Sequence, residues 1–335
     1  MTLLTNAQVE PEASTDNPSG PKKRFRGSNF RMFGGPFIGL VVMVIVFSLL
    51  SPYFLTAQNF SNLLQQVSIL GIMAAGATLV ILIGGIDLSV AAVMAFTLMF
   101  SAWLYKNIGL PFIPALIAGV LIGALIGLIN GVLSTFGKIQ PFVATLATMS
   151  ICLGLSLLIT NGNTINDFPE WFGDLAVAKV WVIPVQAILM FAIFGIAAFW
   201  LKYRPLGRSL YAIGGNEEVA RLSGLPVRWT KTYVYILAST LAAIAGWLNM
   251  ATLDSAQPTA AGNYLLNVIA VVVIGGASLA GGVGTMGSTL LGLFVVGVIN
   301  NGMSFTGISP NTKPVVIGII IILAVLADQI GRAHV

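Results

Sequence analysis

The ionisable side chains of this chain concentrate in one short stretch, the run IGGNEEVARLSGLPVRWTK from Ile213 to Lys231. Two glutamates and three basic residues lie within it, although only 8% of the 335 residues are charged. Such a density of charge indicates a surface that meets water or a polar partner.

The middle of this run predicts a short helix from Glu217 to Ser223. Asn216 is suited to cap its start, and the two glutamates of the first turn complement the helix dipole. Gly224 is typical of the position that follows a helix, and Pro226 prevents continuation. The residues assigned to this helix and its caps are Asn216, Glu217, Glu218, Arg221, Leu222 and Gly224, with Val219 on the same face as Leu222. The helix either packs on its own protein or docks into a groove of a partner.

The sequence contains no group of residues that is typical of a catalytic or metal-binding site. The single cysteine, Cys152, lies in an apolar stretch, and the single histidine, His334, is next to the last residue. These two exclude a zinc site of Cys and His, an internal disulfide framework and Cys/His or Ser/His/Asp catalysis. Gly137-Lys138 lacks the spacing of a phosphate-binding loop. We therefore expect no catalytic residue, no metal and no cofactor bound by this chain.

GVGTMG (282–287) fits the pattern G-x-G-x-x-G, but no βαβ unit surrounds it. We interpret these glycines as a close approach of helices or a chain break between them.

Asp87, in IGGIDLSV (83–90), is the only charged residue between Arg31 and Lys106. One interpretation is that Asp87 caps a helix beginning at Leu88, while Gly84 and Gly85 end the preceding helix. The other is that this break lies inside the membrane and lines a solute pathway, because ionisable groups there are costly.

Further candidates for a pathway are glycines or amides inside apolar segments. Interhelical hydrogen bonding is the simpler role for the amides, and contact with a solute is the alternative. The set comprises Asn130, Gly275, Gly276, Asn300 and Asn301.

The elements that position these residues are long and apolar. Hydrophobic residues make up 57% of the chain, and the charged share is about a third of the ~25% typical of soluble domains. The segments are apolar on every side, which favours helices over barrel strands. Stretches of about 20 apolar residues predict an all-α polytopic membrane protein with about ten transmembrane helices. They lie near 34–54, 63–86, 88–104, 111–135, 141–160, 180–201, 232–252, 264–284, 286–304 and 314–330.

The distribution of basic residues predicts the orientation. With the N-terminus in the cytoplasm, thirteen of the sixteen Lys and Arg residues fall on the cytoplasmic side, which the positive-inside rule favours. Residues 1–32 are then a disordered basic tail and residues 33–332 the transmembrane domain. The loop 202–231 and both termini are cytoplasmic. The net charge of +5 is explained by these loops and not by nucleic acid.

Two internal likenesses hint at duplication. LIGLINGVLSTFG (125–137) and VVGVINNGMSFTG (295–307) lie in spans predicted to run in opposite directions, as an inverted repeat requires. VILIGGIDLS (80–89) also resembles VVVIGGASLA (271–280) at a different spacing, and one duplication does not explain both.

As a set, several motifs resemble the permease subunits of bacterial ABC sugar importers, in the group that serves ribose, xylose and arabinose, and within it the ribose permeases. They are GATLVILIGGIDLSVAAVMAF (76–96), KIQPFVATLATM (138–149), AIGGNEEVARLSGLPV (212–227), SAQPTAAGNY (255–264), VVIGGASLAGGVGT (272–285) and GVINNGMSFTGISP (297–310).

This resemblance implies a type II importer permease in the bacterial inner membrane, working as a dimer of two permease copies surrounded by lipid. It implies a cytoplasmic ATPase that binds the ATP and magnesium, and a periplasmic sugar-binding protein. The segment 213–227 is implied to be the coupling helix that docks in a groove of the ATPase. The expected function is import of a monosaccharide such as ribose, without chemistry on it.

Two alternatives stay open. An ion-coupled secondary transporter would also be polytopic, but it would be expected to have several intramembrane carboxylates. A permease of the same family could instead carry an autoinducer, a polyol or a branched-chain amino acid.

Overall fold

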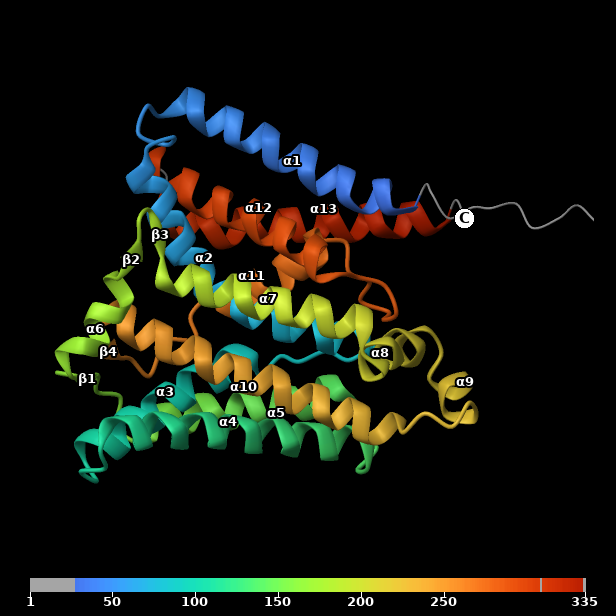
Figure 1. Cartoon of the computed structure of the whole chain (residues 1–335), viewed down its shortest axis with the longest axis horizontal. Helices are drawn as coiled ribbons and strands as arrows, with labels where there is room; N and C mark the ends of the chain where they lie inside the picture. The colour runs from blue at the N-terminus through green and yellow to red at the C-terminus, as the bar shows by residue number, and fades with distance from the viewer. Residues whose placement is uncertain (1–27, 308, 334–335) are drawn as a thin grey trace, which may run out of the picture.

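A computed structural model describes residues 28–307 and 309–333. The long helices in this part run alongside one another as one bundle (Figure 1). The helices are α1 (Ser28–Leu50), α2 (Ala57–Leu82), α3 (Val90–Lys106), α4 (Phe112–Thr135), α5 (Pro141–Leu158), α6 (Glu170–Val177), α7 (Val185–Tyr203), α8 (Pro205–Gly215), α9 (Glu217–Leu222), α10 (Val227–Leu253), α11 (Tyr264–Ile274), α12 (Met286–Phe305) and α13 (Lys313–Ala333), with a 3-10 turn at Pro310–Thr312.

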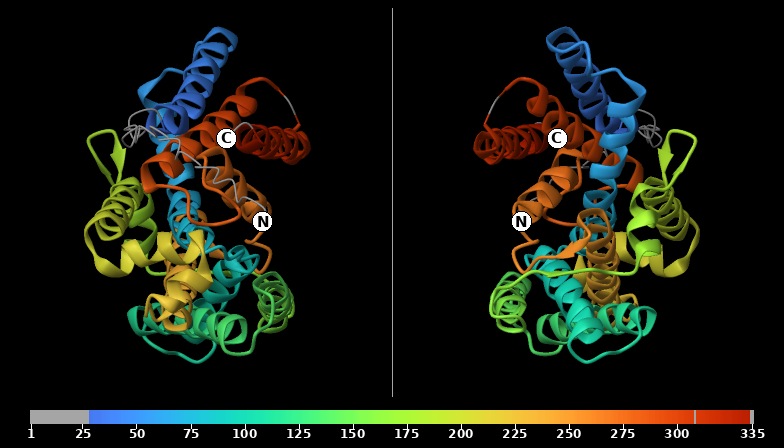
Figure 2. Two further views of the ribbon diagram at one scale, coloured as in Figure 1. Left: turned by 90° about the vertical axis from the view of Figure 1, so that its right-hand side faces the viewer. Right: turned by 90° about the vertical axis from the view of Figure 1, so that its left-hand side faces the viewer.

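Four two-residue strands complete the described part. β1 (Ile165–Asn166) pairs antiparallel with β4 (Ser255–Ala256), and β2 (Lys179–Val180) pairs antiparallel with β3 (Ile183–Pro184). The strands and α6 gather at one end of the bundle, while α8 and α9 lie at the other, where α1 begins and α13 ends (Figures 1 and 2). We call these the strand end and the α9 end.

Each of the ten predicted spans contains a helix, so the all-α polytopic fold is confirmed. Within residues 28–307 and 309–333, six helices are long and apolar enough to cross a membrane, namely α2, α4, α5, α7, α10 and α12. Shorter apolar helices occupy the other four predicted spans. Of the predicted tail, residues 1–27 lie outside the described part, and α1 begins at Ser28, before the predicted boundary at residue 33.

The predicted span 264–284 is wrong in its second half. α11 ends at Ile274, and its eleven residues rise only about 16 Å, roughly half of the ~30 Å hydrocarbon core. Gly276 has a φ of +80°, and its N–H bonds the carbonyl of Val273 while that of Ala277 bonds Val272. This is the Schellman arrangement, which ends a helix where a glycine takes the left-handed conformation.

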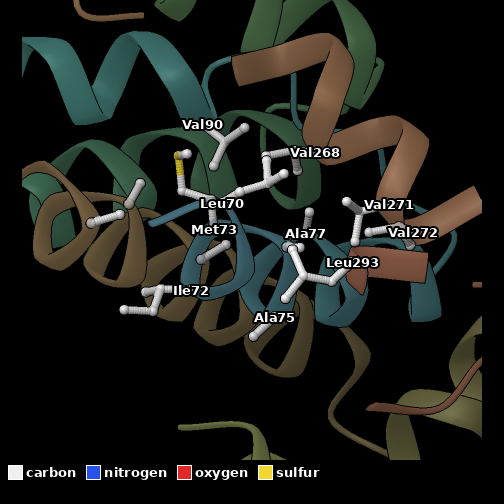
Figure 3. Packing of buried hydrophobic residues seen from close by; sticks show 14 of the residues in the cluster. Leu70, Ile72, Met73, Ala75, Ala77, Val90, Val268, Val271, Val272 and Leu293 are labelled. Atoms are coloured by element: carbon white, nitrogen blue, oxygen red, sulfur yellow. The ribbon is translucent and has the colours of Figure 1, made fainter. Parts of the chain in front are cut away.

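The core is built around α2. In its most apolar stretch 89% of the residues are buried, against 28% in α5 and in α7, so α2 is the central helix and the other two are peripheral. Leu70 and Met73 of α2 pack with Val268 and Val271 of α11 and with Leu293 of α12 (Figure 3). A helix that is apolar on all sides is stable only in such a place or in lipid.

α4 and α10 pack through glycines spaced four residues apart. Gly123, Gly127 and Gly131 of α4 face α10, and a Cβ on Gly131 would lie 2.7 Å from the Cα of Thr232. A Cβ on Gly127 would overlap the carbonyl oxygen of Tyr235. Small residues at this spacing let two helix backbones approach closely where the hydrophobic effect gives little driving force.

We therefore expect Gly127→Leu to destabilise the protein. Its side chain would meet backbone atoms of α10, which do not move aside, so unfolding should become easier by about 1–3 kcal/mol or more. Thermal unfolding of the purified protein in detergent measures this. Gly195→Leu is the matched control, because nothing lies within 4 Å of a Cβ at Gly195 in α7. Equal stability of the two variants would contradict the close α4–α10 packing.

The two pairs of similar segments differ in the relative direction of the helices that carry them. The segment 125–137 lies on α4, which runs toward the α9 end, while 295–307 lies on α12, which runs away from it, as an inverted repeat requires. The glycine breaks after α2 and after α11, however, both follow helices that run toward the α9 end and meet there. The second likeness is therefore a parallel one, and the inverted repeat stays a prediction.

Candidate functional site: the α9 helix and the glycine junction

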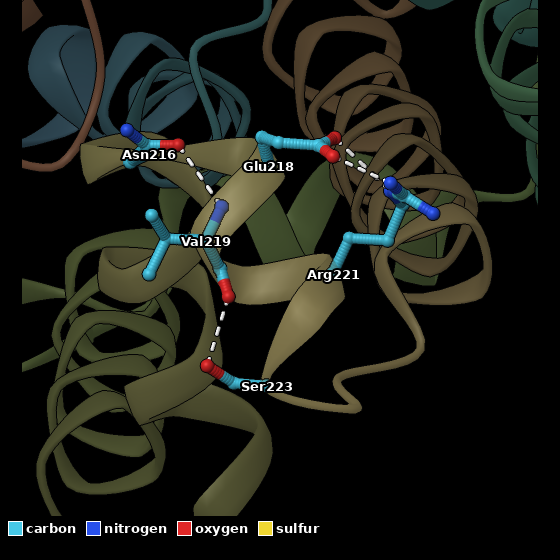
Figure 4. A network of polar contacts seen from close by, with 5 residues as sticks. All are labelled: Asn216, Glu218, Val219, Arg221 and Ser223. Carbon is cyan, nitrogen blue, oxygen red and sulfur yellow. Dashed lines mark hydrogen bonds and ion pairs between the residues drawn. The ribbon is translucent and has the colours of Figure 1, made fainter.

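α9 forms with the predicted start and caps, and it ends at Leu222, one residue before the predicted end at Ser223. The Asn216 side-chain oxygen accepts the N–H of Val219 at 3.0 Å, and Gly224 follows the helix with a φ of +83° (Figure 4). The N–H groups of Gly224 and Leu225 bond the carbonyls of Arg221 and Ala220. Both ends of this six-residue helix are thus satisfied, which a helix too short to be stable by itself requires.

The charges of α9 pair among themselves and with α10. Arg221 binds the Glu218 carboxylate with two nitrogens, as Figure 4 shows, and Lys231 of α10 binds Glu217 at 2.5 Å. The hydrogen bond from Arg221 holds the pKa of Glu218 below its ordinary value, so this exposed pair stays ionised at neutral pH. These ion pairs orient α9 and neutralise part of its charge.

The apolar face of α9, in contrast to its charged side chains, is left exposed by the described part of the chain. Val219 is 58% and Leu222 73% exposed, whereas Ala220 on the opposite face is buried at 3%. α9 therefore presents a Val219–Leu222 stripe outward and packs on the protein through Ala220. An exposed apolar stripe on a capped and charged helix suits docking into a groove.

Behind α9, three backbone segments meet at glycines. They are the end of α8, the break after α2 and the loop before α12, and we call this contact the glycine junction (Gly84, Gly214, Gly215, Gly281 and Gly282). The Gly282 N–H donates to the carbonyl of Leu82 at 3.0 Å. A Cβ on Gly281 would lie 2.8 Å from the Cα of Gly84, and one on Gly214 would overlap the Leu82 carbonyl oxygen.

The glycine junction links α9 to both chain breaks. α8 connects directly to α9 through Asn216, and the Tyr211 hydroxyl of α8 donates to the carbonyl of Gly284 at 3.1 Å. The contacts are between backbones, so α8 packs directly on the end of α2 and on the loop before α12. The interpretation of 282–287 as a close approach and chain break is confirmed, since Gly282 and Gly284 have φ of +72° and +150°.

The break after α2 differs from the prediction in one respect. Gly84 and Gly85 do end α2, with Gly84 at a φ of +71° and its successor bonding Val80. The next helix, however, begins at Val90 and not at Leu88, so Asp87 is not its N-cap. Asp87 Oδ1 accepts the N–H and the hydroxyl of Ser89 at 2.8 and 2.6 Å. This local turn competes with helix formation and delays the start of α3.

Asp87 and Asn130 belong to one buried network. The Asn130 amide donates to the Ser89 hydroxyl at 3.0 Å and accepts from Thr148 of α5 at 2.6 Å. Asn130 is 0% and Asp87 8% exposed, and Asp87 Oδ2 has no hydrogen-bond partner. The network ties α3, α4 and α5 together, so interhelical bonding accounts for the contacts of Asn130.

The other candidates are distributed between the two ends. Gly275 packs against the backbone of Ser288 and Thr289, at the break after α11. Asn301 pairs with Asn59 of α2 through two amide hydrogen bonds of 2.9 Å, and Asn300 is half-buried beside it. The structure therefore does not gather the eight pathway candidates at one place. Across residues 28–307 and 309–333, no three His, Cys, Asp or Glu side chains come together as a metal site would need.

Sequence reasoning missed Gly214 and Tyr211, which complete the glycine junction. The signal that could have found it is the repeated glycine pair, which occurs within the first apolar span at 34–35 and also at 84–85, 214–215, 275–276 and 281–282. The last four pairs lie between apolar spans or beside the charged run, and a glycine pair permits backbone contact that no other residue does.

Ten apolar helices, two glycine-ended breaks and a capped helix at one end define a multi-pass membrane transport subunit. A family model described as the branched-chain amino acid transport system / permease component matches residues 59–325. The chain belongs to this family of transporter permease components, and it is accordingly a transport subunit and not an enzyme.

Curated relatives cover nearly the whole chain. It is 46% identical to the ribose import permease protein RbsC of Bacillus subtilis over 88% of this chain and 92% of that one. The D-allose transport system permease protein AlsC of Escherichia coli is 36% identical over 96% and 98%, and the L-arabinose ABC transporter permease protein AraH of Azospirillum brasilense is 32% identical over 97% and 96%. No solved structure matches the chain. The family of ABC importer permeases implies a partner ATPase and a periplasmic binding protein.

Proposed function

We propose that this permease imports a monosaccharide, a ribose-like pentose or a related sugar, from the periplasm to the cytoplasm of a bacterium. The proposal rests on relatives named for ribose, allose and arabinose transport, which match this chain over at least 87% of its length. ATP hydrolysis by a partner ATPase drives the import, and a periplasmic sugar-binding protein delivers the solute.

The structural observation that supports coupling to an ATPase is the exposed apolar stripe of α9, Val219 and Leu222. The stripe sits in a groove of the ATPase, with the ion pairs of α9 at its rim. ATP-driven closure of the ATPase then moves α9 and α8 together. The glycine junction passes this movement to the breaks after α2 and α11, and the permease changes the side on which it is open.

The α9 end is the cytoplasmic side in this proposal. A cavity of about 820 Å³ beside α9 is lined by Lys138, Arg221, Arg228 and Lys231, with Glu217 as its acidic residue. Basic residues concentrate on the cytoplasmic side of inner-membrane proteins. Both termini then lie in the cytoplasm, with lipid around the bundle and a second copy of the chain completing the transporter.

Uptake of labelled D-ribose by cells that produce the permease with its ATPase and binding protein tests the proposal. We expect uptake to stop when the ATPase or the binding protein is deleted, and to continue when the proton and sodium gradients are dissipated and ATP is maintained. Uptake that follows the gradients would favour a secondary transporter instead. Uptake of L-leucine but not D-ribose would favour an amino acid permease.

Asp87 distinguishes the two mechanisms directly. Asp87→Asn keeps the Oδ1 acceptor for both Ser89 donors, and its amide takes the place of an oxygen that bonds nothing, so D-ribose uptake should persist. Asp87→Leu leaves both donors unpaired, which costs about 1–3 kcal/mol for each group, and should lower the amount of folded protein. A proton-coupled carrier would lose uptake in Asp87→Asn, although the protein remained folded.

A further inference from the structure

At the strand end, opposite α9, helices α2, α10, α11 and α12 enclose a cavity of about 360 Å³. Five carboxamides line it, Asn62, Gln65, Gln66, Asn249 and Asn301, together with three hydroxyl-bearing side chains and two aliphatic ones. Among the described residues that line it there is no Asp, Glu, Lys or Arg. We call this space the amide cavity. Its volume lies within the range of small-molecule sites, about 300–1,000 Å³.

The deepest polar group of the amide cavity is incompletely bonded. The Asn249 amide donates to the Tyr264 hydroxyl at 3.3 Å, but its oxygen Oδ1 has no hydrogen-bond partner among the residues that the structure describes. Asn249 is only 6% exposed, so its oxygen is removed from bulk water. A buried acceptor without a donor is unfavourable, and a ligand hydroxyl in the cavity would supply one.

The side of the cavity formed by α2 also favours a ligand with polar groups. Asn62 and Gln66 are four residues apart, lie on one face of an apolar helix and are exposed. Gln58 donates to the Asn62 oxygen at 3.0 Å, and because amides that face lipid are costly, this polar face is suited to a polar solute. The other two amides of the cavity are held in place, since Gln65 donates to the carbonyl of Ala176 and Asn301 pairs with Asn59.

We infer that the amide cavity binds the transported solute on its outer side and that this solute is a neutral polyhydroxylated molecule. Amide and hydroxyl groups both donate and accept, and so do the hydroxyls of a sugar. An amino acid would instead require charged partners for both its carboxylate and its ammonium group, and although the Lys313 ammonium donates to the Ser304 hydroxyl at 2.9 Å, none of the described lining residues is acidic. This inference rests on the proposed sugar import, and it deepens it by naming the binding residues.

A cysteine introduced into the cavity tests the inference without removing any amide. Ser304 lines the cavity and is exposed, and Ser304→Cys changes one atom. The native Cys152 is buried at 2%, so it should not react. Asn107→Cys is the control, because Asn107 is exposed just after α3 and does not line the cavity. In cells that hold the whole transporter, D-ribose uptake by each variant is measured before and after treatment, and the loss is expressed relative to the same untreated variant.

A membrane-impermeant thiol reagent should then label both variants but stop D-ribose uptake only in Ser304→Cys. Labelling of Ser304→Cys without loss of uptake, or no labelling at all, would overturn the inference. Failure of the wild type to take up D-ribose would instead refute the proposed sugar import, and the inference that rests on it would fall with it.

Protection by solute identifies the ligand class. In the purified complex of permease and ATPase, D-ribose at high concentration should slow the labelling of Ser304→Cys, and L-leucine at the same concentration should not. Neither solute should change the labelling of Asn107→Cys. Protection by L-leucine alone would assign the cavity to an amino acid. Protection by neither solute would show that the cavity does not bind the transported solute.

Discussion

Replacing Leu222 by aspartate is expected to separate the permease from its ATPase. Leu222 is 73% exposed and has no side-chain role in the fold of α9, so the permease itself should remain folded. In the proposed complex this side chain and Val219 fill the groove of the ATPase, and an aspartate there would bury an unpaired carboxylate. The loss of such an anchor costs about 2 kcal/mol or more, a fall in affinity of about thirtyfold or more.

Co-purification from membranes in mild detergent measures this effect. Leu222→Asp should be recovered in normal amounts without the ATPase, and D-ribose uptake should be lost. Leu55→Asp is the matched control, because Leu55 is 70% exposed at the strand end of the molecule. It should retain the ATPase. Retention of the ATPase by Leu222→Asp would show that α9 is not the docking helix.

The charges of α9 should matter less than its apolar stripe. The residues predicted from the sequence for the docking helix were Asn216, Glu217, Glu218, Arg221, Leu222 and Gly224, a set that includes three charged side chains. In the structure Arg221 already binds Glu218, and Glu217 already binds Lys231. Exposed pairs of this kind contribute at most about 1 kcal/mol. Exposure of the Val219–Leu222 stripe, which only the folded chain shows, moves the expected contact to these residues.

The helices were predictable from the sequence because lipid imposes a simple rule. A span must be helical and about 20 residues long, and so the apolar stretches identify nearly every helix of the bundle. α9 was predictable for a different reason, since Asn216 and Gly224 are local signals at its two ends. α11 was not, because the apolar run continues beyond Ile274 and only the backbone shows that Gly276 ends the helix.

The amide cavity and the glycine junction were less predictable from the sequence than the helices were. The amides of the amide cavity are far apart in sequence, and only the antiparallel packing of α2 and α10 brings Gln66 and Asn249 to one space. The four-residue spacing of Asn62 and Gln66 was a visible signal of a polar face. The partners of that face depend on helix packing, which short motifs do not encode.

Gly214 and Gly215 are neighbours at the end of α8, yet their surroundings differ completely. A Cβ on Gly214 would overlap the carbonyl oxygen of Leu82 and lie against the N–H of Gly282. Nothing lies within 4 Å of a Cβ on Gly215. The same substitution at the two positions therefore separates an effect of close contact from an effect of helix propensity.

We expect Gly214→Ala to abolish D-ribose uptake. The added methyl group meets backbone on both sides, so α8 must move away from the break after α2, at a cost of about 1–3 kcal/mol. Such a displacement breaks the contact through which the ATPase is proposed to move the transmembrane helices. ATP hydrolysis by the co-purified complex should then continue without import, which a simple loss of folding would not produce.

Gly215→Ala is expected to import D-ribose as the wild type does. Alanine is favoured over glycine in a helix by about 1 kcal/mol, and at Gly215 it contacts nothing, so α8 should if anything become more stable. The measurement that distinguishes the two variants is D-ribose uptake per mole of ATP hydrolysed. A low ratio in Gly214→Ala and a normal ratio in Gly215→Ala would locate the coupling in the glycine junction. Equal ratios would show that movement of α9 reaches the membrane helices by another contact, such as the ion pair between Glu217 and Lys231 of α10.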